Sequence, residues 1–164
     1  MEFNLRTMTG LDAAGYRRAD PQSAYSLCHD LPQRYRHSCA AEAVQLWILD
    51  TPHFDKAAFA SFGQLCRGFD TRELVEYCYS GIGNHLPITD RPADDIIAFC
   101  SAATAGDSIG ALICRGTAAA ISRLAVKESP IQICSGLMGD AQAYCTAYAT
   151  GTADLEHMLP MPEL

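Results

Sequence analysis

Eight cysteines are the residues of this 164-residue sequence with the most chemistry to offer. They are Cys28, Cys39, Cys66, Cys78, Cys100, Cys114, Cys134 and Cys145. Taken as consecutive pairs, the two members lie 11, 12, 14 and 11 residues apart, and the first members recur every 34 to 38 residues. A period in the mid-thirties is typical of repeats built from two helices. The spacing therefore predicts about four helical hairpins, each holding one pair of cysteines.

Local disulfides are the state of these cysteines that the pattern favours. A proline or glycine lies between the two members of every pair, with an aspartate beside it, so each pair spans the turn of a hairpin. We expect the pairs Cys28–Cys39, Cys66–Cys78, Cys100–Cys114 and Cys134–Cys145. Each contributes about 3 kcal/mol in the chain-entropy model. Pairing between adjacent repeats is the alternative, because eight cysteines allow 105 connectivities.

Two other states of the thiols stay open at this stage. Cys28-His29 and His37-Ser38-Cys39 bring two thiols and two imidazoles into one hairpin, a ligand set that can hold copper(I) or zinc. The short C-x₂-C spacing of common zinc sites is absent from the sequence. Reduced cysteines can also fill a core as small apolar side chains. A metal-binding or thiol-redox protein is therefore the alternative function.

Helix starts recur in phase with the cysteines. A capping side chain stands directly before a proline at Asp20-Pro21, Thr51-Pro52 and Ser129-Pro130. This order is typical of the first residues of a helix. We expect a first helix after each start, including a short one over residues 131–134, and a second helix through the second cysteine. Asp70 and Glu73 have the spacing of a capping box for one second helix, and Asp107 is placed to cap another.

These elements predict a single all-α repeat domain over residues 1–164. We expect hairpins over 20–50, 51–88, 89–127 and 128–159, a partial or capping repeat over 1–19 with a helix near 11–18, and a tail over 160–164. A small residue lies two positions after each second cysteine, and it would let neighbouring helices approach closely. These residues are Ala41, Ser80, Gly116 and Ala147.

The second hairpin carries a resemblance to a known family. Ala57-Ala58-Phe59 on a first helix is followed by Tyr77-Cys78-Tyr79-Ser80-Gly81-Ile82-Gly83 on a second. With the repeat period, this resembles α-hairpin repeat proteins of the tetratricopeptide and Sel1-like type, especially their cysteine-linked variants. Sel1-like repeats often carry a tyrosine followed by G-x-G at this point. The resemblance implies a solenoid-like array and a protein-interaction scaffold, not an enzyme.

Composition narrows the partners and the compartment. The net charge of −7 argues against nucleic acid, and no apolar run reaches the length of a membrane span. The cysteine pairs indicate an oxidising extracytoplasmic compartment, namely the periplasm, the exterior or an intermembrane space. The first residues lack the pattern of a signal peptide, so we expect that Met1 is not the start of a full precursor.

Catalytic motifs are missing from the sequence, and this shapes the functional hypothesis. G-x-S-x-G, P-loop and H-E-x-x-H patterns do not occur. We expect no enzyme activity and no cofactor, and we predict a non-catalytic scaffold or accessory subunit that binds other protein subunits. Trp47, just before the loop to Thr51, is the candidate interface anchor, because tryptophan is enriched among residues that dominate binding energy.

Overall fold

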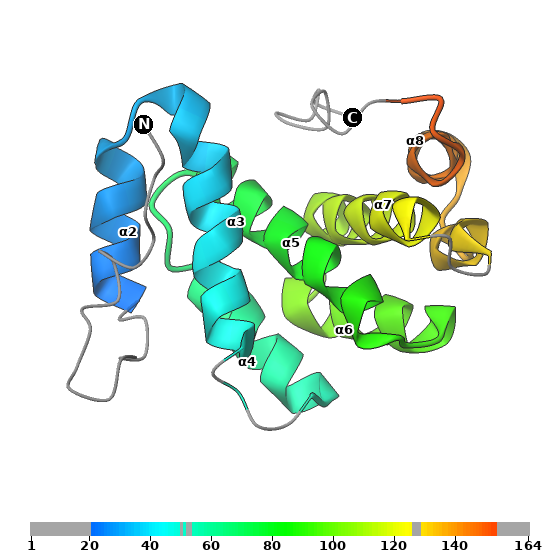
Figure 1. The fold of residues 1–164 in the computed structure, drawn as a ribbon, viewed down its shortest axis with the longest axis horizontal. Helices are drawn as coiled ribbons and strands as arrows, with labels where there is room; N and C mark the ends of the chain where they lie inside the picture. Colours follow the sequence, from blue (N-terminus) through cyan, green and yellow to red (C-terminus); the bar gives the residue numbers. More distant parts are fainter. Residues whose placement is uncertain (1–20, 50, 52–53, 126–128, 154–164) are drawn as a thin grey trace.

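The computed structural model describes residues 21–49, 51, 54–125 and 129–153, and this part of the chain is helical without any strand (Figure 1). Its elements are α2 Pro21–Asp30, α3 Gln33–Leu49, α4 Lys56–Cys66, α5 Arg72–His85, η1 Leu86–Thr89, α6 Ala93–Thr104, α7 Ser108–Leu124, η2 Pro130–Cys134 and α8 Gly139–Thr150. Four hairpins follow one another: α2–α3, α4–α5, α6–α7 and η2–α8. The expected helix near 11–18 and the expected tail lie outside the described residues.

Side-chain caps fix where several helices begin. The Asp55 carboxylate accepts from the amide of Ala58 at 2.8 Å, and α4 therefore begins at Lys56, not at the Thr51-Pro52 step that the sequence indicated. Thr71, and not Asp70, is the N-cap of α5. The capping-box prediction was wrong by one residue, because a hydroxyl follows directly after the carboxylate and makes the cap instead.

The first element of the fourth hairpin is a 3₁₀ helix at the place where the sequence indicated a short helix. Residues Pro130–Cys134 form a 3₁₀ helix and not an α-helix. The Arg115 side chain of α7 donates hydrogen bonds to the carbonyls of Ile133, at 2.7 Å, and of Ser135. These carbonyls are satisfied from outside the segment, so it does not need further helical turns to pair them.

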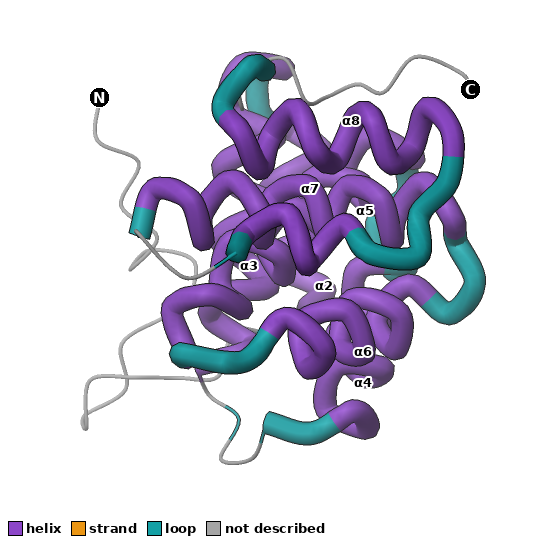
Figure 2. Tube along the Cα trace, turned by 90° about the vertical axis from the view of Figure 1, so that its right-hand side faces the viewer, coloured by secondary structure: helices purple, strands orange, loops and turns teal. Residues whose placement is uncertain are grey.

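The second helices of the hairpins form one row and the first elements another. α3 packs on α5, α5 on α7 and α7 on α8, while α4 packs on α6 and α6 on η2. The axes of α3, α5, α7 and α8 turn progressively along the row, so that α3 stands upright in Figure 1 while α8 is seen end-on. Figure 2 shows α8 as an outermost helix, above α7. One cluster of buried side chains runs from α2 to α8 between these layers.

Small residues allow the close crossings in the row of second helices. A Cβ atom at Gly81 of α5 would lie 2.3 Å from the carbonyl oxygen of Ala41 in α3. The Ser80 hydroxyl shares a hydrogen bond of 3.2 Å with that of Thr117 in α7. Ala41 and Ser80 therefore lie at helix crossings, as their small size predicted. Gly116 is buried in α7, and Ala147 is only half-buried on α8.

The register of the hairpins repeats more strictly than their sequences do. Every second helix begins six residues before its cysteine: residue 33 before 39, 72 before 78, 108 before 114, and 139 before 145. We therefore count positions from that cysteine as position 0. Equivalent residues of different hairpins can then be compared directly.

Candidate interaction surface

Four disulfides lie inside the hairpins. They join Cys28 to Cys39, Cys66 to Cys78, Cys100 to Cys114, and Cys134 to Cys145, which are the consecutive pairs that the spacing predicts. Their Cα–Cα distances of 5.4 to 5.7 Å lie within the usual window for this bond. All eight residues are at most 2% exposed. Each disulfide therefore crosslinks the turn of its own hairpin from within the core.

The oxidised cysteines leave no free thiol in the chain. Thiolate chemistry would require prior reduction, because a disulfide sulfur is not the nucleophile or ligand that a thiolate is. In the first hairpin, the His29 Nδ1 atom lies 2.7 Å from the Asp70 carboxylate, and the His37 ring stacks on Tyr77 with centroids 4.6 Å apart. Across the described residues, no three His, Cys, Asp or Glu side chains gather as a metal site.

Polar side chains link each hairpin to the next. The Arg72 guanidinium of α5 donates two hydrogen bonds to the Asp107 carboxylate, at 2.5 and 3.0 Å, and one to Glu76 at 2.5 Å. The bond to Asp107 raises the pKa of Arg72 above its ordinary value. Burial raises the pKa of Asp107, but bonds from Arg72 and from the Gly110 amide outweigh it and lower the pKa overall. Asp107 thus caps α7 and holds α5 against it.

The link between α3 and α5 centres on Glu73. Its carboxylate accepts from the Tyr77 hydroxyl at 2.9 Å and from the Gln33 amide at 3.4 Å, and it lies 3.9 Å from the Arg36 guanidinium. Burial and the bond to Glu73 together raise the pKa of Tyr77 to about 12, so the phenol stays protonated as a donor. All these groups are structural partners of one another.

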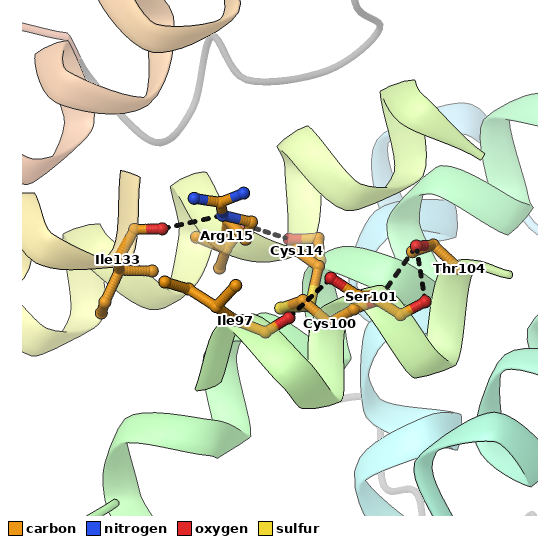
Figure 3. Close-up of a disulfide and its surroundings, with 9 residues drawn as sticks. Ile97, Cys100, Ser101, Thr104, Cys114, Arg115 and Ile133 are labelled. Carbon is orange, nitrogen blue, oxygen red and sulfur yellow. Dashed lines mark hydrogen bonds between the residues drawn. A yellow bond between two sulfur atoms is a disulfide. The ribbon is translucent and has the colours of Figure 1, made fainter. Parts of the chain in front are cut away.

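Two arginines, Arg67 and the buried Arg115, link hairpins through backbone carbonyls. Arg67 at the end of α4 donates to the carbonyl of Ala103 in α6 at 3.0 Å. Arg115 is 7% exposed, and burial lowers its pKa. Figure 3 shows it beside the Cys100–Cys114 disulfide, with its guanidinium directed to Ile133. These arginines join successive hairpins and are not placed to receive a substrate.

Two open hollows lie on the surface of the described residues. The first, of about 320 Å³, lies between α2 and the α4–α5 turn and is lined by Tyr25, Ser26, His29, Asp30, Gly68 and Asp70. The second, of about 400 Å³, runs along α8 and is lined by Gly139, Gln142, Ala143, Thr146, Ala147, Thr150 and Thr152. Ala147, whose small size predicted a close helix crossing, lines the second of these hollows. Neither hollow was predicted from the sequence.

The predicted anchor Trp47 is part of the core. Its side chain is 5% exposed and meets the Tyr25 ring edge-on, with centroids 6.2 Å apart. Trp47 was a candidate anchor only if its side chain were not buried, and it instead faces α2 of its own hairpin. Leu49, Ile88 and Leu124 are instead exposed by 67%, 69% and 58%, and each lies ten residues after its second cysteine. This periodic feature is visible in the sequence once the cysteines are aligned.

Comparison with known proteins does not assign the chain to a family. No family model matches the sequence, and searches of curated proteins and of solved structures found no match. Within the described residues, every helix is too short or too polar to cross a bilayer. The function of the protein is therefore inferred from the geometry of its described residues.

Proposed function

We propose that this protein is a non-catalytic interaction or assembly subunit, built as a solenoid-like array of disulfide-linked hairpins for an oxidising compartment outside the cytosol. The observation that carries the proposal is the combination of one buried disulfide per hairpin with second helices that pack in sequence. Arrays of this kind share one core and present extended surfaces to partners.

Contacts at a recurring sequence distance support the array. Hydrogen bonds among the first three hairpins join residues 35 to 40 positions apart, as in Tyr25 to Leu65, Arg67 to Ala103, and Ser80 with Thr117. The bonds from Arg115 to the shorter fourth hairpin span 18 and 20 positions. A separation of one repeat length means that each hairpin contacts mainly its neighbour. This nearest-neighbour pattern distinguishes a repeat array from a bundle, in which distant helices also meet.

The chemistry of the described residues favours a scaffold over a catalyst. The charged side chains with the best geometry, Arg72, Asp107 and Glu73, bind one another across hairpin boundaries. The exposed aliphatic residues Leu49 and Ile88 occupy equivalent positions, which suits a surface used for docking. Protein partners, and no cofactor, are what this distribution of side chains supports.

The compartment is tested by trapping thiols in living cells that make the protein. An alkylating agent added before lysis should leave all eight cysteines unmodified, because they are oxidised and buried. Denaturation, reduction and a second alkylation should then label all eight. Eight thiols labelled in the first step, or copper or zinc that co-purifies, would instead support the metal-binding or thiol-redox alternative.

The interaction role is tested by size and composition of the native assembly. Crosslinking before lysis should place the chain in a complex with a second protein at a fixed ratio. In a parallel sample without crosslinker, reduction of the disulfides should dissociate this complex, since the hairpins that form the surface lose their disulfide crosslinks. A chain that remains a lone monomer under these conditions would contradict the proposal.

A further inference from the structure

The second helices use one set of positions to contact the hairpin that follows. Arg72 at −6 binds Asp107, Arg36 at −3 pairs with Glu73, and His37 at −2 stacks on Tyr77. Further along the helices, the contacts are Tyr79 at +1 with Gly110, Ala41 and Ser80 at +2 with Gly81 and Thr117, and Gly83 at +5 with the carbonyl of Cys114. We call positions −6, −3, −2, +1, +2 and +5 the forward face.

In α8 the forward face is the wall of the open hollow. Its six positions are Gly139, Gln142, Ala143, Thr146, Ala147 and Thr150, and all six line the hollow of about 400 Å³. Two preceding second helices, α3 and α5, use these positions to hold the next helix, and the buried residues of α8, Cys145, Tyr148 and Ala149, lie at other positions. The hollow is thus continuous with the row of helix interfaces.

We propose that the forward face of α8 binds a helix of a different protein, which continues the row of second helices by one member. This inference rests on the proposed interaction role and names the surface and the kind of partner. The equivalent face of α3 and of α5 is covered in each case by a helix of the following hairpin. Among the described residues the same positions are open on α8, and they fit the same kind of occupant.

The residues of the face define the chemistry of that helix. The charged and aromatic members found elsewhere, Arg36, His37 and Arg72, are replaced on α8 by Gln142, Ala143 and Gly139. An uncharged face cannot compensate a buried charge on its partner, so the partner helix must be uncharged where it docks. α5 meets α3 with Glu73, Tyr77 and Gly81, at −5, −1 and +3. A partner helix that used the same three positions, i, i+4 and i+8, would need apolar or small residues there to match the uncharged face of α8.

A second copy of this chain is a poorer occupant. Stacking of copies in sequence would place positions −5, −1 and +3 of α3 on the forward face of α8. These are Arg34, Ser38 and Glu42, and the first two are exposed. The charges of Arg34 and Glu42 would be buried against small uncharged side chains, at a cost that the contacts do not offset. A polar outer face of this kind is typical of the solvated end of an array.

The test is site-specific photo-crosslinking in the cells that make the protein. A benzophenone amino acid is placed at Ala143 or Thr150 on the forward face, and at Ala57 or Ser101 as matched exposed controls on first helices. The face positions should crosslink to a different protein, at a segment that is helical and has apolar or small residues at i, i+4 and i+8. The control positions should not give that product.

A charge on the face provides the second arm. Ala143→Arg should reduce the crosslink from Thr150 by about tenfold or more, because the arginine has no partner in the docked state. Ala57→Arg should not change it, and both variants should keep the melting temperature of the original chain, since both residues are exposed on helices.

Each other outcome would overturn the proposal. These outcomes are a crosslink to residues 154–164 of the same chain, a crosslink to a second copy, no product, or a product unaffected by Ala143→Arg. If a partner crosslinks from another surface while the α8 positions stay unlabelled, this inference fails and the proposed interaction role stands.

Discussion

Gly63 offers the sharpest test of how the hairpins are spaced. It lies on α4 where this helix crosses α6, and a Cβ atom there would lie 1.7 Å from the carbonyl oxygen of Ala103, where ordinary contact begins at 3.4 Å. The same carbonyl accepts a hydrogen bond of 3.0 Å from Arg67. Gly63→Ala must therefore move the two helices apart or displace the carbonyl from its donor.

The expected loss of stability follows from three terms. Overpacking against backbone costs about 1–3 kcal/mol. Loss of a hydrogen bond from a charged donor costs about 1.5–3 kcal/mol. Alanine regains about 1 kcal/mol of helix propensity over glycine. The net destabilisation should be about 1.5–5 kcal/mol, which lowers the melting temperature by about 3–20 °C in a chain of this size.

Thermal unfolding of the oxidised protein by circular dichroism measures this change. Gln64→Ala, at the adjacent exposed position of α4, is the control and should stay within about 0.5 kcal/mol. Arg67→Ala removes the same hydrogen bond, together with a longer one of 3.4 Å to the Tyr79 hydroxyl, so its effect should be less than additive with that of Gly63→Ala. A melting temperature that stays the same or rises in Gly63→Ala would refute the close crossing of α4 and α6, and full additivity would refute the shared carbonyl.

Three further predictions concern charge, pH and redox state. Asp107→Ser keeps a cap on α7 and loses the half-exposed pair with Arg72, so it should cost less in urea unfolding than Asp107→Ala, which loses both and should cost about 1–2 kcal/mol. Equal costs would contradict the cap, and an Asp107→Ser variant as stable as the original chain would contradict a stabilising ion pair. Burial lowers the pKa of His85 below 6.5, so the unfolded chain takes up the proton first as the pH falls. The stability from neutral His85 is present above pH 6.5 and is lost below it, and His85→Gln should flatten the fall in urea midpoint between about pH 8 and pH 5. Full reduction, verified by thiol titration, should lower the melting temperature steeply, because each disulfide contributes about 2–4 kcal/mol against a total of about 5–15 kcal/mol, and an unchanged curve would remove the disulfides from the stability argument.

The phase of the cysteines was enough to predict the hairpins and their disulfides. A disulfide requires two backbones within a narrow distance, so a pair that spans a turn fixes both the turn and the antiparallel course of the chain. Asp107 was also predictable as a cap, since it follows Gly106 and precedes a long apolar segment. Such features depend on residues close in sequence.

Features that depend on neighbouring hairpins were not predictable in the same way. Trp47 was a candidate anchor because the sequence does not show that its ring packs on Tyr25, which lies on the other helix of the same hairpin. Residues 131–134 were expected to form a first helix like the others. They lie in a 3₁₀ helix, and the carbonyl of Ile133 accepts from Arg115, eighteen residues earlier in the sequence. Asp70 looked like a cap, but its carboxylate meets His29 of the preceding hairpin. In each case a contact at a longer range outweighed the local pattern.

The hairpins are held internally by covalent links and to one another by non-covalent contacts. All four disulfides lie within hairpins, whereas the contacts between hairpins are non-covalent: ion pairs such as Arg72–Asp107 and close crossings at glycines such as Gly63. Each hairpin is therefore fixed internally, while the angle between hairpins depends on weaker contacts. A helix bound to the forward face of α8 would add one more contact of the weaker kind. That contact could form and dissociate without any change in the disulfides.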